Sequence, residues 1–120
     1  VLVLGSSTWG AGELHDDWYD GVNVLKKCDL SHKYVALFGC GDSDSYSDTF
    51  CDAIGIIYED LKDTHCKFCG AVDTAGYTFD SSIAVVDGKF VGLPIDEVNE
   101  DNQTEERISA WAEQVKQEIS

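Results

Sequence analysis

Two segments rich in small and polar residues each follow a short apolar run, and each contains one aromatic residue. Trp9 stands in the first, residues 6–12, and Tyr46 stands in the second, residues 39–46. Loops that follow neighbouring parallel strands meet at one edge of the sheet, where ligands bind in such folds. An aromatic ring from each loop can hold a planar ring between them, and this indicates a flavin.

Length and charge limit the other possibilities. The chain has 120 residues, 43% of them apolar, which suits one domain over residues 1–120 with a single core. It contains no apolar run of about 18 residues and no signal-peptide pattern, so we expect no membrane insertion. Its net charge of −15 repels phosphate backbones, and this argues against nucleic-acid binding. The same charge favours encounter with basic protein surfaces.

The five cysteines do not predict a metal centre or a disulfide framework. Their odd number and scattered spacing favour the reducing cytoplasm. Cys66 and Cys69 form a C-x-x-C pair beside His65, but zinc normally needs a second pair of ligands, and none stands at a suitable spacing. A redox pair normally begins a helix, whereas this one follows a predicted helix and leads into a strand. We therefore predict neither a metal site nor catalytic residues.

The apolar periodicity predicts an alternation of strands and helices. We expect strands at residues 1–4, 34–38 and 67–72, a short or broken helix at 13–27, a helix at 50–61 capped by Asp48 or Thr49, a hairpin at 84–93 closed by Pro94, and a last helix capped within 101–104. Ile108, Trp111, Val115 and Ile119 form the predicted buried stripe of that last helix. The order predicts an α/β fold, a doubly wound parallel sheet with helices on both faces.

The apolar run at residues 1–4 presents a difficulty in this arrangement. As an edge strand it is open to aggregation. We expect strands upstream of it to cover this edge in the intact molecule.

The sequence resembles the long-chain flavodoxins over essentially all 120 residues. The resemblance rests on Ser7-Thr8-Trp9, Gly12-Glu13-Leu14, Phe38-Gly39-Cys40-Gly41-Asp42, residues 46–50, Asp52-Ala53-Ile54-Gly55, residues 88–93 and Arg107-Ile108-Ser109-Ala110-Trp111. It implies a flavodoxin-like domain that lacks the first two strands, the first two helices and the phosphate loop. It also implies that an insertion at about 78–97 splits the last strand.

The resemblance further implies FMN as the cofactor. By similarity, Trp9 and Tyr46 stack on opposite faces of the isoalloxazine, while the backbone of the two loops bonds its polar edge and Thr49 and Phe50 lie near it. The residues implied in binding are Ser7, Thr8, Trp9, Gly10, Ala11, Gly12, Cys40, Gly41, Asp42, Tyr46, Thr49 and Phe50.

The residues themselves support a redox role without catalytic groups. Gly10 can accept the peptide rotation that turns its carbonyl toward flavin N5. Asp42, Asp44 and Asp48 penalise the anionic, fully reduced ring and so lower its potential. We therefore expect a low-potential one-electron carrier rather than an enzyme.

Two other functions stay open. The first is an FMN-binding module of a larger reductase or of a quinone-reducing flavoprotein. The second is a receiver-like signalling domain without flavin, although Asp42 lies beyond its strand and Lys89 precedes an inserted one. For the carrier we expect basic-surfaced redox partners, such as an NADPH-dependent flavoprotein reductase, and a monomer when the protein is complete. Because the phosphate loop is missing, we expect the chain to bind FMN weakly by itself.

Overall fold

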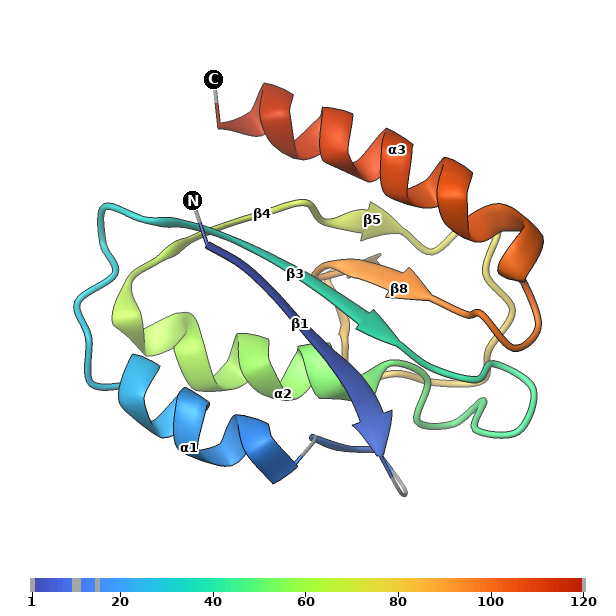
Figure 1. Ribbon diagram of the computed structural model, residues 1–120, viewed down its shortest axis with the longest axis horizontal. Helices are drawn as coiled ribbons and strands as arrows, with labels where there is room; N and C mark the ends of the chain where they lie inside the picture. Colours follow the sequence, from blue (N-terminus) through green and yellow to red (C-terminus); the bar gives the residue numbers. More distant parts are fainter. Residues whose placement is uncertain (1, 10–11, 15, 120) are drawn as a thin grey trace.

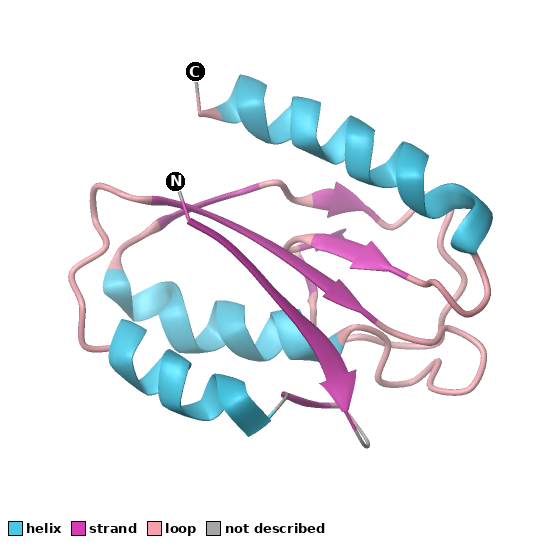
Figure 2. Cartoon of the chain, viewed as in Figure 1, coloured by secondary structure: helices cyan, strands magenta, loops and turns pink. Residues whose placement is uncertain are grey.

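The computed structural model describes residues 2–9, 12–14 and 16–119, and for Trp9, Leu14, Asp16 and Asp17 the backbone alone. Its main sheet contains five strands: β1 (Leu2–Trp9), β2 (Glu13–Leu14), β3 (Tyr34–Cys40), β4 (Lys67–Cys69) and β8 (Leu93–Ile95). The helices are α1 (Asp16–Leu25), α2 (Asp52–Leu61) and α3 (Asp101–Glu118), and the 3-10 turn η1 (Lys62–Thr64) follows α2. α1 and α2 cover one face of the sheet and α3 covers the other (Figures 1 and 2). The predicted α/β sheet with helices on both faces is confirmed.

The centre of the sheet explains the two cores. β3 pairs in parallel with β1, β4 and β8, and its residues Val35, Ala36 and Leu37 are fully buried. Val35 and Leu37 join the core beneath α2, whereas Ala36 joins the core beneath α3 with Trp111. A strand that is covered on both faces reads as an unbroken apolar run, as this one does.

The last strand of the sheet is split into β4 and β8. β1 pairs with β3 from Val35 to Cys40, so β4 and β8 must share the opposite edge of β3. Between them, β5 (Val72–Asp73), β7 (Lys89–Phe90) and β6 (Val85–Val86) form a small antiparallel sheet. The two halves are thus separated by residues 70–92, whereas the sequence predicted an insertion at about 78–97.

The predicted hairpin is partly confirmed and partly wrong. Asp87 and Gly88 form its turn with φ values of 53° and 82°, as a tight turn between β6 and β7 requires. Pro94 does not close the hairpin, because it lies inside β8 and pairs with Gly39. Among the described residues β8 pairs with β3 alone, so the missing N–H of proline interrupts no second ladder.

β1 is longer than its apolar run. Pairing with β3 continues through Ser6 and Ser7, and the end of β1 pairs with β2 through Thr8. The prediction that residues 6–8 form a loop is therefore wrong, because backbone pairing overrides the weak strand preference of small polar residues. β2 also displaces the start of the predicted helix at 13, and α1 begins at Asp16.

The predicted caps of the later helices are wrong. α2 begins after Cys51, which has a left-handed backbone and no side-chain cap bond. Instead, the hydroxyl of Thr8 accepts the N–H of Ala53 at 3.1 Å, so a neighbouring strand supplies the cap. α3 begins after Glu100, again without a side-chain cap.

The predicted stripe of α3 is only partly buried. Trp111 and Val115 are buried, and Ile119 packs against the same core, but Ile108 is exposed. Among the described residues, the outer edge of β1 pairs with β2 only at Thr8 and Trp9, and Val3 is exposed. That upstream strands cover this edge stays a prediction. No helix in the described part of the chain is long and apolar enough to cross a membrane.

Candidate functional site

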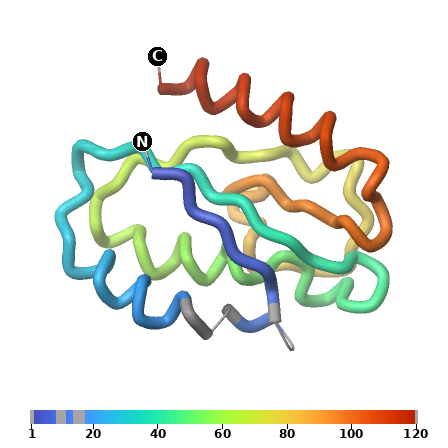
Figure 3. Tube along the Cα trace, viewed as in Figure 1, coloured from blue at the N-terminus to red at the C-terminus, as the bar shows by residue number. Residues whose placement is uncertain are grey.

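The strand register brings the two marked segments together. Ser6 pairs with Gly39 and Ser7 pairs with Cys40, so β1 and β3 end side by side at the same level. The turn after β8 starts at this end of the sheet as well, because Cys40 also pairs with Ile95. In the Cα trace, the loop after β3 and the turn after β8 both lie at the right-hand end of the molecule (Figure 3). This is the edge at which open α/β sheets bind ligands.

A cavity of about 210 Å³ opens between these segments. It is lined by Ser7, Thr8, Cys40, Gly41, Asp42, Tyr46, Thr49 and Val98. Tyr46 is 52% exposed in a turn of small residues and lines the cavity, so its ring can contact a ligand. Among the described residues, the buried hydroxyl of Thr49 has no hydrogen-bond partner. This hydroxyl is therefore available to a ligand or a water molecule in the cavity.

Asp42 organises the loop that carries Tyr46. Its carboxylate accepts the N–H groups of Asp44 and Ser45 at 3.1 and 3.0 Å, and its carbonyl accepts the N–H of Tyr46 at 2.9 Å. The N–H of Ser45 and the side chain of Asn99 lower the pKa of Asp42 below its ordinary value. The carboxylate therefore keeps its negative charge beside the cavity at neutral pH.

Sequence reasoning missed the turn that follows β8. Val98 lines the cavity, and the buried carboxylate of Asp96 accepts hydrogen bonds from Ser43 and Asn99. The signal was an Asp three residues before an Asn after an apolar segment, which is typical of a side-chain-stabilised turn. The predicted hairpin ends at Leu93 and is closed by Pro94, so the sequence does not anticipate a strand that ends at this edge.

The other residues expected in the site have different positions. Phe50 does not line the cavity; it is fully buried against Phe79 and Phe90. Gly12 adopts a φ of 89° beside Asp52, so a side chain there would be strained. The side chain of Trp9, together with Gly10 and Ala11, lies outside the described residues. The stacking of Trp9 on a flavin therefore stays a prediction.

The cysteines do not form a reactive cluster. Partial burial and the carboxylate of Glu97 raise the pKa of Cys40, so it stays a neutral thiol at the cavity wall. Cys66 and Cys69 bond different backbone carbonyls, those of Leu61 and Val35. No group of His, Cys, Asp or Glu within the described ranges could hold a metal ion.

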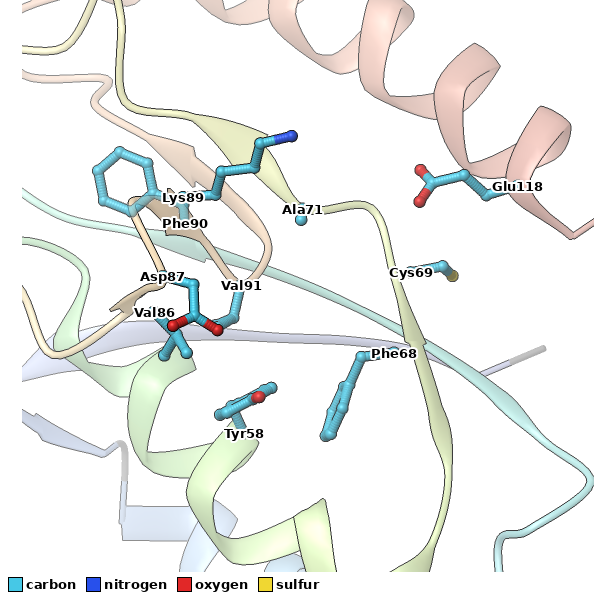
Figure 4. Close-up of a pocket in the computed structure, with 10 residues that line it drawn as sticks. All are labelled: Tyr58, Phe68, Cys69, Ala71, Val86, Asp87, Lys89, Phe90, Val91 and Glu118. Carbon is cyan, nitrogen blue, oxygen red and sulfur yellow. The ribbon is translucent and has the colours of Figure 1, made fainter.

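A second cavity, of about 240 Å³, lies between α2, β4, the β6–β7 turn and the end of α3 (Figure 4). Tyr58 and Phe68 pack against each other on one side of it, with ring centroids 4.5 Å apart. Asp87 and Glu118 bring carboxylates to its rim. None of the described residues expected to hold the flavin lines this cavity, so it is separate from the candidate site.

Comparison with known proteins agrees with this geometry. The family profile described as Flavodoxin matches residues 1–111. This chain belongs to the flavodoxin family. It is 44% identical to Flavodoxin 1 of Azotobacter vinelandii over 120 residues, covering 98% of this chain and 69% of the relative. It is 49% identical to a flavodoxin of Helicobacter pylori over 115 residues, covering 96% of this chain and 69% of the relative.

A solved structure gives the same result for the fold. The flavodoxin of Fusobacterium nucleatum bound to flavin mononucleotide superposes with a TM-score of 0.93 at 32% identity. The match covers 98% of this chain and 70% of that protein. This flavodoxin therefore spans about two thirds of the length of the relatives it matches.

Proposed function

We propose that this flavodoxin is a one-electron carrier, not an enzyme, that holds FMN non-covalently where β1 and β3 end. The observation that carries the proposal is the cavity there, with the half-exposed ring of Tyr46 on its wall. The FMN-bound relative from Fusobacterium nucleatum supports the choice of ligand. When bound, FMN supplies the one-electron chemistry, and the protein binds, orients and shields it.

The residues of the cavity fit a flavin ring. Tyr46 offers an aromatic face, the free hydroxyl of Thr49 offers a donor and an acceptor, and the neutral thiol of Cys40 adds no charge. The charge of Asp42 disfavours a negative charge on the ring, and this lowers the potential. Trp9, Gly10 and Ala11 would complete the opposite wall.

The size of the cavity indicates how tightly the chain binds. Pockets for drug-sized ligands usually measure about 300–1,000 Å³. The cavity measures about 210 Å³, which is below this range, so we expect it to take part of the ring and not the ribityl phosphate. We therefore expect the isolated chain to bind riboflavin and FMN with similar affinities, both weaker than micromolar.

Titration with the two flavins tests this expectation. Riboflavin and FMN are added separately to the chain, and quenching of flavin emission is followed to saturation. Equal, weak binding of both is expected. Submicromolar binding of FMN would contradict the expectation of weak binding, and the absence of binding of either flavin at millimolar concentration would refute the carrier proposal.

The partners proposed for this flavodoxin are basic-surfaced redox proteins, such as an NADPH-dependent flavoprotein reductase. Its net charge of −15 and the exposed Asp44 and Asp48 near the cavity favour weak, steered complexes. The rate of flavin reduction by such a reductase should fall steeply as salt rises from about 10 mM to 0.15 M, as screening requires. A rate independent of salt would contradict steering.

Its location and organisation complete the proposal. The five free cysteines suit a reducing compartment, so we place the protein in the cytoplasm. We propose that residues 1–120 act as one flavodoxin-like domain, that the protein is a monomer, and that the segment between β4 and β8 is the long-chain insertion.

A further inference from the structure

A buried carboxylate connects the turn after β8 to the loop that carries Tyr46. Asp96 is only 1% exposed, and its side chain accepts the N–H of Ser43 and the N–H of Asn99, each at 3.0 Å. The hydroxyl of Ser43 donates to it as well. Burial by itself would raise the pKa of Asp96, but the hydrogen bonds from Ser43 and Asn99 outweigh burial and lower it. A buried carboxylate with this many donors is a rigid anchor.

Asn99 joins this anchor to the second carboxylate of the loop. Its side-chain amide donates to Asp42 at 2.8 Å and to the two oxygens of Asp96 at 3.1 and 3.2 Å. Asp42 in turn holds the N–H groups of Asp44 and Ser45. The side-chain amide of Asn99 therefore connects the carboxylates of Asp42 and Asp96, and both carboxylates hold the loop that carries Tyr46.

The same turn also reaches the cavity. Val98 stands between the two anchoring residues, is 70% exposed and lines the cavity with Tyr46. The backbone N–H of Gly41 donates to the carbonyl of Ile95 at 2.9 Å, which holds the start of the loop against the same segment. Anchor and cavity wall are thus built from four consecutive residues, 96–99.

We infer that the turn at 96–99 is a third wall of the flavin site, in which Asp96 and Asn99 position Tyr46 and Val98 contacts the ring. This inference rests on the proposed function, because the ligand it assigns to Val98 is the flavin. Asp96 and Asn99 act through the loop and are positioning residues. Val98 is a binding residue.

Three variants of the chain separate these roles. Asn99→Ala removes the bridging amide, Val98→Ser removes only the apolar wall, and Asn102→Ala is the matched control, an exposed asparagine in the first turn of α3. Hydrogen exchange is measured on the flavin-free chain. Riboflavin affinity and the emission of the saturated complex are measured by titration.

The expected results differ for each variant. In Asn99→Ala, the amides of Ser43, Asp44 and Ser45 should exchange about tenfold faster while those of β3 do not change. Its riboflavin dissociation constant should rise about tenfold, as the loss of hydrogen bonds to charged groups permits. Its saturated complex should also emit more strongly, because Tyr46 no longer stacks closely. A purely structural role would not change that emission.

Val98→Ser should raise the riboflavin dissociation constant about threefold without changing the hydrogen exchange of residues 43–45. Asn102→Ala should change neither the dissociation constant nor the exchange. The inference is overturned if Asn99→Ala leaves the exchange of residues 43–45 or the affinity at the parental values, or if Val98→Ser binds as the parent does. Failure of the proposed function is distinguishable, since it would appear as an absence of flavin binding in the parent chain itself.

Discussion

Two aromatic residues that the sequence places in one site should respond to substitution in opposite ways. Phe50 and Tyr46 stand four residues apart, but Phe50 is 0% exposed and Tyr46 is 52% exposed. The ring of Phe50 lies 5.7 Å from that of Phe79, 6.0 Å from Phe90 and 6.2 Å from Tyr77, measured between centroids. The structure therefore predicts that Phe50→Leu affects stability, whereas Tyr46→Leu affects flavin binding.

The size of the first effect follows from the three ring contacts. Aromatic pairs contribute about 0.5–1.5 kcal/mol each beyond area burial, and leucine keeps most of the buried apolar area. We expect Phe50→Leu to lower the free energy of unfolding by about 2–3 kcal/mol. For a domain of this size about 1 kcal/mol corresponds to about 4 °C, so the Tm should fall by about 8–12 °C.

Tyr46→Leu should leave the fold intact, because an exposed side chain usually changes stability by less than about 0.5 kcal/mol. Its riboflavin dissociation constant should rise about two- to tenfold, the equivalent of one lost stacking contact. Thermal unfolding followed by circular dichroism gives the Tm, and flavin titration at 15 °C gives the affinity while both variants are folded. The reasoning is refuted if Tyr46→Leu lowers the Tm as much as Phe50→Leu does. It is equally refuted if folded Phe50→Leu loses more affinity than Tyr46→Leu.

Two further substitutions test the packing and the alkaline limit of the fold. A Cβ at Gly39 would lie 2.6 Å from Cγ2 of Ile54 and 2.8 Å from the carbonyl oxygen of Ser6. Gly39→Ala should therefore lower the free energy of unfolding, measured in urea, by about 1–3 kcal/mol. A smaller decrease would show that α2 can move away from β3. Burial raises the pKa of Tyr77 to about 12, and its hydroxyl donates to the carbonyl of Pro94. Because the folded state holds this proton more tightly than the unfolded state, the stability that it contributes is complete below about pH 10 and is lost as the pH rises toward 12. The urea midpoint of Tyr77→Phe should therefore fall less between pH 10 and 12 than that of the parent, and equal falls would contradict this assignment.

The apolar patterns predicted which elements form, but not where each one ends. Residues 34–38 were predicted as a strand because they are buried on both faces, and β3 contains them. Ser6 and Ser7 are predicted in a loop because they follow the apolar run, yet β3 offers them backbone partners. Residues 93–95 have the composition of either a hairpin or a buried strand. Only the pairing of Leu93 with Phe38 decides, and this pairing joins residues 55 positions apart in the sequence.

In the candidate site, too, residues with a local sequence signal could be predicted, and residues that depend on distant partners could not. Tyr46 was predictable because a large ring among small residues has no local reason to be there. Asp96 and Asn99 were not, since their partners Ser43 and Asp42 lie more than 50 residues away along the chain. A residue whose role is to hold another residue leaves no local pattern of its own.

The glycines near the site illustrate why a loop-like composition can be misread. Gly5, Gly39 and Gly41 suggest flexible, ligand-cradling backbone, but none of them has a positive φ. Instead, another group packs closely against each of them. The ring of Phe38 lies over Gly5, and Ile54 packs on Gly39. The backbone nitrogen of Cys51 lies 2.9 Å from the position that a Cβ of Gly41 would occupy. These glycines let side chains and backbone approach the ends of β1 and β3 closely. The small residues therefore allow close packing around the ends of β1 and β3, where the proposed flavin site lies.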